Sequence, residues 1–370
     1  MEPMGIYIHI PFCLSKCPYC DFYSIKYQED TAEKYVQSVA RALESSSVRG
    51  RKVNTVYFGG GTPVLLGEKL VYLLDEVKKN FDVAPDSEIT LEANPAAMTL
   101  ETLQKLHEGG FNRISIGVQS ASDSELARLG RRHNFAQAVE SVQLSQQAGF
   151  QNVSVDLMIG TPDQTKDSIS SFISTFAGLS VQHISGYLLK IEKGTPFAKQ
   201  HIEKICPDED ASVELYLHTV AEMEKHGFFQ YEVSNFAKKG FESKHNLKYW
   251  RCQEYLGVGP AAHSFIDGKR FYFPRNLQDF VESKDPWLLT CPDGEGGGLF
   301  EYVMLRLRLK EGLNLSDLKN LFGEDIAPIA HRAEFLQEHG LLTFNGENIS
   351  LTPQGFLVSN SVIVDLLEYC

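Results

Sequence analysis

Three cysteines within eight residues are the part of this sequence best suited to chemistry. They stand at Cys13, Cys17 and Cys20, in a C-x3-C-x2-C arrangement. A loop with three thiolates can bind three irons of a four-iron cubane and leave the fourth iron open to another ligand. A structural zinc site usually needs four ligands, often as two separated pairs, and no second C-x-x-C pair follows. The spacing therefore favours a cluster, with zinc completed by His9 as the weaker alternative.

The composition indicates an acidic globular protein. The 370 residues are 43% hydrophobic and carry a net charge of −13, which opposes binding to nucleic acid and to anionic lipid surfaces. No apolar run approaches the roughly 18 residues that span a bilayer, and the N-terminus lacks the features of a signal peptide. Seven cysteines, an odd number in a chain of this size, favour reduced thiols. We expect a cytoplasmic protein with no membrane span and no nucleic-acid partner.

Alternating strand and helix patterns must position the cysteines. Strands are predicted at residues 5–10, 55–58, 88–92, 113–118, 153–158 and 183–189, and helices at 31–45, up to 78, after 99, and at 122–129, 135–148 and 166–177. Six such units predict an α/β fold whose parallel sheet has helices outside it. Chemistry in such folds lies on the loops after the strands, where the cysteines and the glycine-rich segments of this chain occur.

The C-terminal part is predicted to be a separate small module. Residues 283–298 are rich in glycine and are expected to be a linker after a domain of residues 1–282. Residues 299–370 show helices at 299–310, 315–322 and 326–338, then a hairpin turning at Asn345-Gly346. This pattern is typical of a winged-helix-like α+β module, but five Lys and Arg against ten Asp and Glu argue against DNA binding. Whether the module gates the barrel mouth or docks a partner stays open.

Polar residues in several strands indicate a shared ligand. Glu92, Gln119 and Asp156 lie in or at the ends of successive apolar strands, where an unpaired polar group is costly. A glycine triplet, residues 59–61, follows the second strand, where its backbone can approach a ligand closely. Three polar groups at comparable depth favour one polar ligand over three independently satisfied side chains.

The cysteine loop also carries a family resemblance. The string YIHIPFCLSKCPYCDF, residues 7–22, resembles the cluster loop of radical S-adenosylmethionine (SAM) proteins, and more narrowly of the group of oxygen-independent coproporphyrinogen oxidases (HemN) and heme chaperones (HemW). The resemblance implies a partial (β/α)6 barrel, a [4Fe-4S] cluster on the three cysteines, and SAM that yields a 5′-deoxyadenosyl radical. The residues that it implies for SAM are Tyr7, Tyr19, Gly60, Gly61, Thr62, Glu92, Gln119, Arg131 and Asp156.

The resemblance also favours the chaperone over the oxidase. The oxidase typically has a fourth cysteine where this chain has Phe22, and a long arm before its cluster loop. His245-Asn-Leu-Lys-Tyr249-Trp250 resembles the H-N-x-x-Y-W signature of the chaperone. We therefore expect a heme chaperone with a heme-binding extension at about residues 190–282. Its expected partners are heme, heme-acceptor proteins and an electron donor.

The resemblance makes His245, Tyr249 and Trp250 the leading heme contacts, with Cys252 and His263 as weaker candidates. From spacing alone, a histidine packed beside a buried tryptophan is the simpler interpretation. The alternative functions are decarboxylation of coproporphyrinogen III, and radical chemistry on another substrate.

Overall fold

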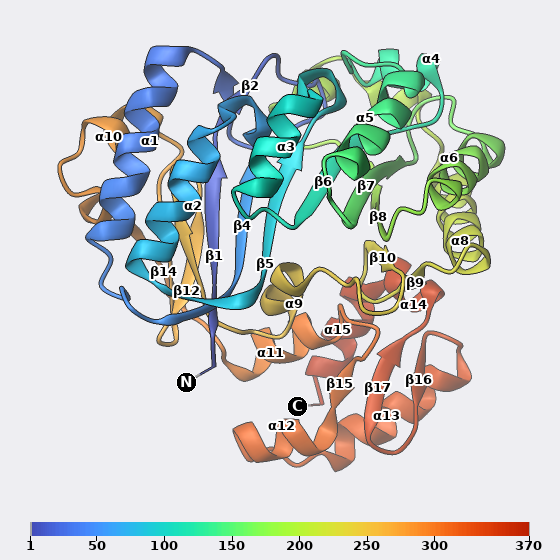
Figure 1. The fold of residues 1–370 in the computed structure, drawn as a ribbon. Coiled ribbons are helices and arrows are strands. Elements are labelled where there is room, and N and C mark those ends of the chain that lie inside the picture. Colours follow the sequence, from blue (N-terminus) through green and yellow to red (C-terminus); the bar gives the residue numbers. More distant parts are fainter. Residues whose placement is uncertain (1, 370) are drawn as a thin grey trace.

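Six parallel strands form the centre of the structure, a computed structural model that describes residues 2–369 (Figure 1). They are β1 (Met4–Ile10), β4 (Lys52–Gly60), β5 (Asp82–Ala93), β6 (Arg113–Gln119), β7 (Asn152–Ile159) and β8 (His183–Leu188). Each pairs in parallel with the next in this order. Both faces of such a sheet must be covered, which is why the strands are apolar runs. The predicted barrel strands are confirmed.

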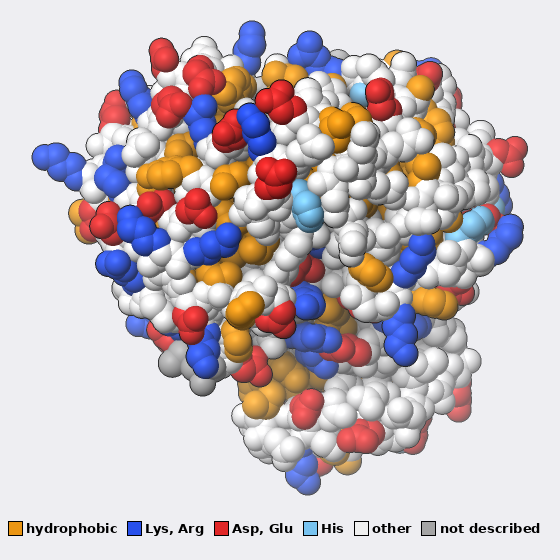
Figure 2. Space-filling model, in the orientation of Figure 1, with side chains coloured by type: hydrophobic (Ala, Val, Ile, Leu, Met, Phe, Trp, Pro, Cys, Tyr) orange, Lys and Arg blue, Asp and Glu red, His pale blue; other side chains and the backbone are white. Residues whose placement is uncertain are grey.

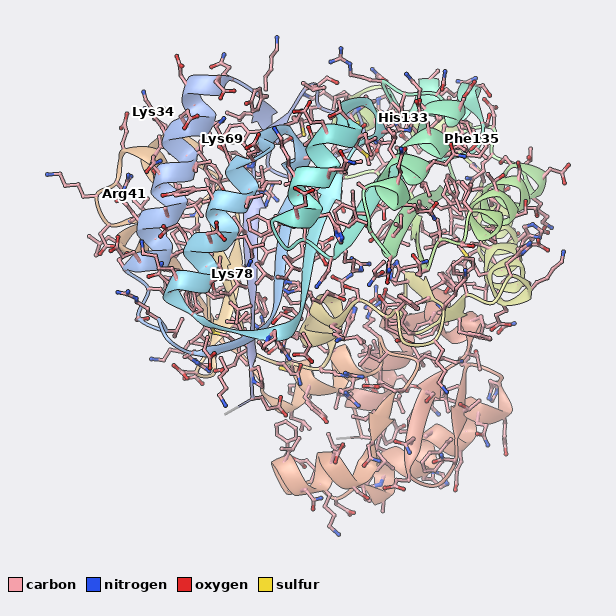
Figure 3. The ribbon with its side chains drawn as sticks, viewed as in Figure 1. Lys34, Arg41, Lys69, Lys78, His133 and Phe135 are labelled. Carbon is pink, nitrogen blue, oxygen red and sulfur yellow. The ribbon has the colours of Figure 1, made fainter. Side chains whose placement is uncertain are left out.

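Amphipathic helices cover the outer face of these strands. They are α1 (Glu29–Glu44), α2 (Lys69–Asn80), α3 (Leu100–Glu108), α4 (Asp123–Arg128), α5 (Phe135–Gln147) and α6 (Lys166–Gly178). In α6 the i, i+3, i+4, i+7 stripe of Ile169, Phe172, Ile173 and Phe176 is buried. The outward faces are charged (Figure 2), as Figure 3 shows for Lys34, Arg41, Lys69 and Lys78 on α1 and α2.

The sheet is wider than the sequence indicated. Beside β1 it continues through β11 (Tyr255–Val258), β12 (His263–Ile266), β13 (Lys269–Tyr272) and β14 (Cys291–Glu295), and beside β8 through β10 (Asn235–Ala237) and β9 (Phe229–Gln230). Together with the six central strands, these form a sheet of twelve strands. Further helices are α7 (Pro196–Lys199), α8 (Glu209–Lys225) and α10 (Leu277–Glu282).

Residues 283–298 are not the free linker that was expected. They hold a short 3-10 helix, Pro286–Leu289, and the edge strand β14. The Trp287 indole donates to the carbonyl of Ala42 in α1 at 2.9 Å, and its ring packs on Phe273 at 5.2 Å between centroids. The sequence did not reveal this strand, because an edge strand pairs on one side only and needs no apolar alternation. The segment is held in place by a single tryptophan, Trp287.

The C-terminal module has its own three-stranded sheet. It contains α11 (Leu299–Arg306), β15 (Leu313–Asn314), α12 (Leu315–Phe322), α13 (Ala327–Glu338), β16 (Leu342–Phe344), β17 (Asn348–Leu351), α14 (Pro353–Leu357) and α15 (Ser359–Leu367). The predicted hairpin is confirmed, and Gly346 in its turn has φ 89°. After the hairpin the chain ends in the two short helices α14 and α15.

The module docks at the N-terminal ends of the barrel strands. The amide of Val233 donates to the Arg308 carbonyl at 3.0 Å, and the amide of Lys310 donates to the Tyr231 carbonyl at 2.9 Å. The loop with the three cysteines follows the other end of β1, so the module lies across the barrel from it (Figure 1). The docked module therefore does not cover the mouth of the barrel where the cysteines lie.

Helix α9 (Lys244–Trp250) closes the barrel beside this module. The carboxylate of Glu88, in the middle of β5, accepts hydrogen bonds from the backbone amides of Lys244 and His245, both at 3.0 Å. A carboxylate at a helix N-terminus satisfies amides that have no partner within the helix and interacts well with the helix dipole. Glu88 also lies near the fully buried Arg113 and raises the pKa of its guanidinium, after the opposing effect of burial.

We predict that Glu88→Ala lowers the free energy of unfolding by about 3 kcal/mol, because it removes the acceptor of two amides at the start of α9 and a negative charge near the buried Arg113. Urea denaturation followed by circular dichroism measures this loss. The exposed Glu108→Ala on α3 is the matched control, expected within about 0.5 kcal/mol of the parent protein. Equal midpoints for the two variants would contradict the capping role.

Candidate functional site

The cysteine loop is held closed at its base by backbone pairing. Strand β2 (Phe12–Cys13) pairs with β3 (Ile25–Lys26), and the amide of Tyr27 donates to the Cys13 carbonyl at 2.9 Å. Within the loop, the amide of Cys20 donates to the Cys17 carbonyl at 3.1 Å. None of the three cysteines forms a disulfide, and all three are half-buried. Burial raises the pKa of Cys20, and the charges of Cys17 and Cys13 raise it further, so the three sulfurs share one electrostatic environment.

His9 is not available as a fourth ligand for zinc. Its Nε2 lies 2.9 Å from the Tyr23 carbonyl, which can only accept, so Nδ1 accepts the Tyr7 hydroxyl proton at 3.0 Å. Burial lowers the pKa of His9 to about 4, which keeps the ring neutral. Over residues 2–369, no three His, Cys, Asp or Glu side chains group around a single-ion site. A cubane differs because each thiolate binds a separate iron.

The glycine motif lies directly against the start of the cysteine loop. The amide of Gly61 donates to the Ile10 carbonyl at 2.8 Å, and the amide of Thr62 donates to the Phe12 carbonyl at 2.7 Å. A Cβ on Gly61 would come within 2.6 Å of the Phe12 carbonyl oxygen, and one on Gly60, whose φ is 112°, within 2.4 Å of the His9 ring. Only glycine fits at either position.

Two side chains direct hydrogen-bond donors at the cysteine sulfurs. The Thr62 hydroxyl lies 3.7 Å from the Sγ of Cys13, and the Nη1 of Arg131 lies 3.5 Å from the Sγ of Cys17. Arg131 also donates to the Tyr19 hydroxyl at 3.3 Å and to the Gly117 carbonyl. Its buried Nε has no acceptor in the part of the chain that the structure describes. Cys17, Thr62 and Arg131 line one narrow pocket, so this guanidinium can pair with a carboxylate ligand there.

His133 keeps the Arg131 loop in place. Its Nε2 donates to the Val118 carbonyl at 3.1 Å, and burial, with the neighbouring Arg131 charge, lowers its pKa to about 4. Figure 3 shows His133 beside Phe135, the first residue of α5. Gln119 ends β6 with φ 83°, in the left-handed region that residues other than glycine rarely adopt. Such strain occurs often at ligand sites.

Two carboxylates in the barrel have strongly raised pKa values. Burial raises the pKa of Glu92 to about 7, although the Gly60 amide at 2.9 Å and the Tyr57 hydroxyl at 2.9 Å both donate to it. Burial likewise raises the pKa of Asp156 to about 6, against hydrogen bonds from Ser185 and Ser115. The Asp156 charge further raises the pKa of Glu92, so a cationic ligand near both carboxylates would relieve this repulsion.

These features fit the two expected cofactors. Three thiols on one loop match the donor set of a cluster, the unpaired Nε of Arg131 matches a carboxylate, and the raised pKa values of Glu92 and Asp156 match a positively charged group. The structure brings together the cysteines, the glycine motif, Arg131 and Tyr19, with Glu92 adjoining through Gly60.

The predicted heme contacts lie elsewhere, at the base of the barrel. His245 is buried, with Nδ1 2.8 Å from the Thr55 hydroxyl and Nε2 2.8 Å from the Tyr249 hydroxyl. Burial lowers its pKa to about 3. Its ring stacks on Tyr57 at 5.2 Å, and Trp250 is half-buried. In this conformation both ring nitrogens of His245 are hydrogen-bonded, so neither is free to bind iron. The sequence had predicted that His245 is an axial iron ligand, and the folded structure does not present it in that way.

Several supporting residues were not predicted from the sequence. Tyr57 connects Glu92 to His245, Tyr23 fixes His9, and Arg113 balances the carboxylates at the barrel centre. Tyr57 lies in the same strand as the glycine motif, two residues before it, and points into the barrel. In a strand, residues two apart point to the same face, so the position of Gly59 could have predicted that Tyr57 faces the same ligand site.

Comparisons with known proteins agree with this geometry. A family model described as the radical SAM superfamily matches residues 7–176, and one described as the HemN C-terminal domain matches residues 298–358. Escherichia coli (strain K12) heme chaperone HemW is 35% identical over 98% of this chain and 98% of its own length. That of Haemophilus influenzae is 34% identical over 98% and 97%. This chain belongs to the HemW heme chaperone family.

The fold of this HemW family member matches that of a solved enzyme. Escherichia coli coproporphyrinogen III oxidase (HemN), described as a radical SAM enzyme, superposes with a TM-score of 0.83 over 100% of this chain and 91% of its own. Its sequence identity of 21% means that the likeness concerns the fold. The expected partial radical SAM barrel with a small C-terminal domain is thereby confirmed. Among residues 2–369, none of the helices combines the length and the apolar composition that a membrane span requires.

We predict that Cys17→Ser loses most of the iron and sulfide of the anaerobically reconstituted protein, because two thiolates hold a cubane poorly. Elemental analysis and the visible spectrum measure the content. Cys206→Ser, at a half-buried thiol outside the loop, is the control and keeps the parental content. Unchanged iron in Cys17→Ser would refute the cluster assignment.

The raised pKa of Glu92 gives a second prediction. With a folded pKa of about 7 against an ordinary 4.5, the folded state holds its proton where the unfolded chain releases it. Stability from this group therefore falls as the pH rises from about 4.5 to 7, by on the order of 1 kcal/mol per unit.

In Glu92→Gln this titration is absent, so the stability of the parent relative to the variant falls over that pH range and then levels off. Thermal melts of both proteins from pH 5 to pH 8, without SAM, measure the difference. Parallel profiles would contradict the raised pKa.

Proposed function

We propose that this protein is a heme chaperone, which binds heme and transfers it to acceptor proteins, and carries a [4Fe-4S] cluster and SAM. The observation that carries the proposal is its similarity to HemW proteins over nearly the full length, at 34–35% identity for the two named relatives. The oxidase with the same fold is only 21% identical. Phe22 supports the same conclusion, since it stands, 67% exposed, where the oxidase typically has a fourth cysteine.

Each part of the barrel mouth has a place in this function. Cys13, Cys17 and Cys20 would hold the cluster, with Thr62 and Arg131 donating to sulfur. Arg131 would pair with the SAM carboxylate. The other SAM contacts would come from Tyr7, Tyr19, Gly60, Gly61, Thr62, Glu92, Gln119 and Asp156. When bound, the reduced cluster supplies one electron to SAM.

Heme acceptors, an electron donor and a cytoplasmic location complete the proposal. Support for the location comes from the thiols, six of which are free within the described chain. Contact between heme and His245 would require α9 to move, because both ring nitrogens are hydrogen-bonded. Tyr249 and Trp250 lie on the same helix and would move with it.

One experiment separates the chaperone from the oxidase. The cluster is reconstituted anaerobically, and then hemin binding, hemin transfer to a heme-free acceptor such as apomyoglobin, and coproporphyrinogen III consumption are measured on one preparation. We expect hemin to bind and transfer, with no decarboxylation in the presence of SAM and a reductant.

Escherichia coli HemN is the positive control for the decarboxylation assay. Robust decarboxylation by this protein, or a failure to bind hemin while the cluster is intact, would refute the chaperone function.

A further inference from the structure

The Tyr57 side chain in β4 contacts two parts of the molecule that have different tasks. Its hydroxyl donates to the Oε1 of Glu92 at 2.9 Å, beside the glycine motif. Its ring stacks on His245 of α9, with 5.2 Å between the ring centroids. Figure 1 shows α9 at the end of the barrel opposite the cysteine loop. One side chain therefore connects a carboxylate of the expected SAM site with the H-N-x-x-Y-W helix.

A glycine leaves the space for this contact. A Cβ on Gly59 would lie 2.8 Å from the Tyr57 ring and 3.0 Å from the Oε1 of Glu92. Any other residue at position 59 would therefore displace the ring from the carboxylate. Tyr57 and Glu92 are each half-buried, so both keep some surface open to a ligand in the barrel.

The hydrogen bond from Tyr57 favours the charged form of Glu92. Burial raises the pKa of this carboxyl, and the bonds from Gly60 and Tyr57 oppose that effect. Burial also raises the pKa of Tyr57 well above its ordinary value, so the hydroxyl keeps its proton and remains a donor. The Tyr57 hydroxyl thus makes Glu92 a better partner for a cation. A cation beside Glu92 strengthens the bond in return, because a charged acceptor holds its donor more tightly.

Helix α9 packs tightly against the strands beside the Tyr57 ring. A Cβ on Gly5 of β1 would lie 3.1 Å from the Lys248 side chain and 3.2 Å from the His245 ring. The buried Lys248 ammonium donates to the Pro3 carbonyl at 2.7 Å. A movement of α9 must therefore break the stack of His245 on Tyr57 together with these contacts.

We propose that Tyr57 is a positioning residue, whose hydroxyl holds Glu92 for the SAM cation and whose ring couples SAM binding to α9. When SAM lies beside Glu92, the bond between hydroxyl and carboxylate strengthens, the Tyr57 ring is fixed more firmly, and His245 is held inside the barrel. This inference rests on the SAM site of the proposed function and adds regulation to it. Release of His245 toward heme requires α9 to move, and bound SAM opposes that movement.

The variant Tyr57→Phe tests the hydroxyl alone, since it keeps the ring and its stack on His245. SAM affinity is measured by equilibrium dialysis on the cluster-loaded full chain under anaerobic conditions. We expect Tyr57→Phe to weaken SAM binding on the order of tenfold, equivalent to about 1.4 kcal/mol. Tyr72→Phe, at an exposed tyrosine of α2, is the matched control and keeps the parental affinity.

Amide hydrogen exchange tests the coupling to α9. With SAM bound to the parent protein, peptides that cover residues 244–250 exchange on the order of fivefold more slowly, whereas peptides of α6 on the outer face do not change. In Tyr57→Phe at saturating SAM, the slowing in α9 is lost. Circular dichroism and cluster content confirm that the variants are folded.

The outcomes distinguish this inference from the proposed function. If the parent protein binds no SAM while its cluster is intact, the proposed SAM site fails. If the parent binds SAM and Tyr57→Phe binds it equally well, the positioning role is wrong and the function stands. Equal slowing of α9 exchange by SAM in both proteins would overturn the coupling. Faster exchange of α6 as well as α9 in Tyr57→Phe, with or without SAM, would show a merely structural role and overturn the proposal.

Discussion

Two backbone hydrogen bonds between the glycine motif and the start of the cysteine loop determine where the chemistry can occur. They run from Gly61 and Thr62 to the carbonyls of Ile10 and Phe12, and join the ends of the neighbouring strands β4 and β1. Both contacts join main-chain atoms, so the two segments must lie very close together. A side chain at Gly61 would prevent this approach, because its Cβ would come within 2.6 Å of the Phe12 carbonyl oxygen. The position of Cys13, and through β2 and β3 the closure of the whole loop, depends on that approach.

The residues around this junction form a continuous polar network through the barrel. Glu92 receives the Gly60 amide and the Tyr57 hydroxyl, and the Tyr57 ring stacks on His245 at the base. Such a network is stable only when nearly all its members are satisfied, since the interior has a low dielectric constant. The unpaired nitrogens of Arg113 and Arg131 are the exceptions, and in Arg131 the exception coincides with the expected SAM carboxylate.

The sequence was most informative where chemistry restricts the residue type. Cysteine spacing, the glycine triplet and the polar residues of successive strands all predicted features that lie at one end of the barrel. Sequence reasoning failed where pairing depends on the tertiary fold. Strand β14 has no apolar alternation, and its assignment needed β13 beside it. His245 was predicted to be open because nothing in its neighbours indicates that Thr55 and Tyr249 occupy both nitrogens.

The edge strand β14 also bears on how the protein behaves at high concentration. A sheet of twelve strands has two open edges, and unpaired backbone at an edge can recruit a strand from another molecule. At one edge β9 has only two residues. At the other, β14 places Pro292, Asp293 and Glu295, which remove an amide donor and add negative charge. A segment that looks like a flexible connector thus protects the sheet against intermolecular extension and aggregation.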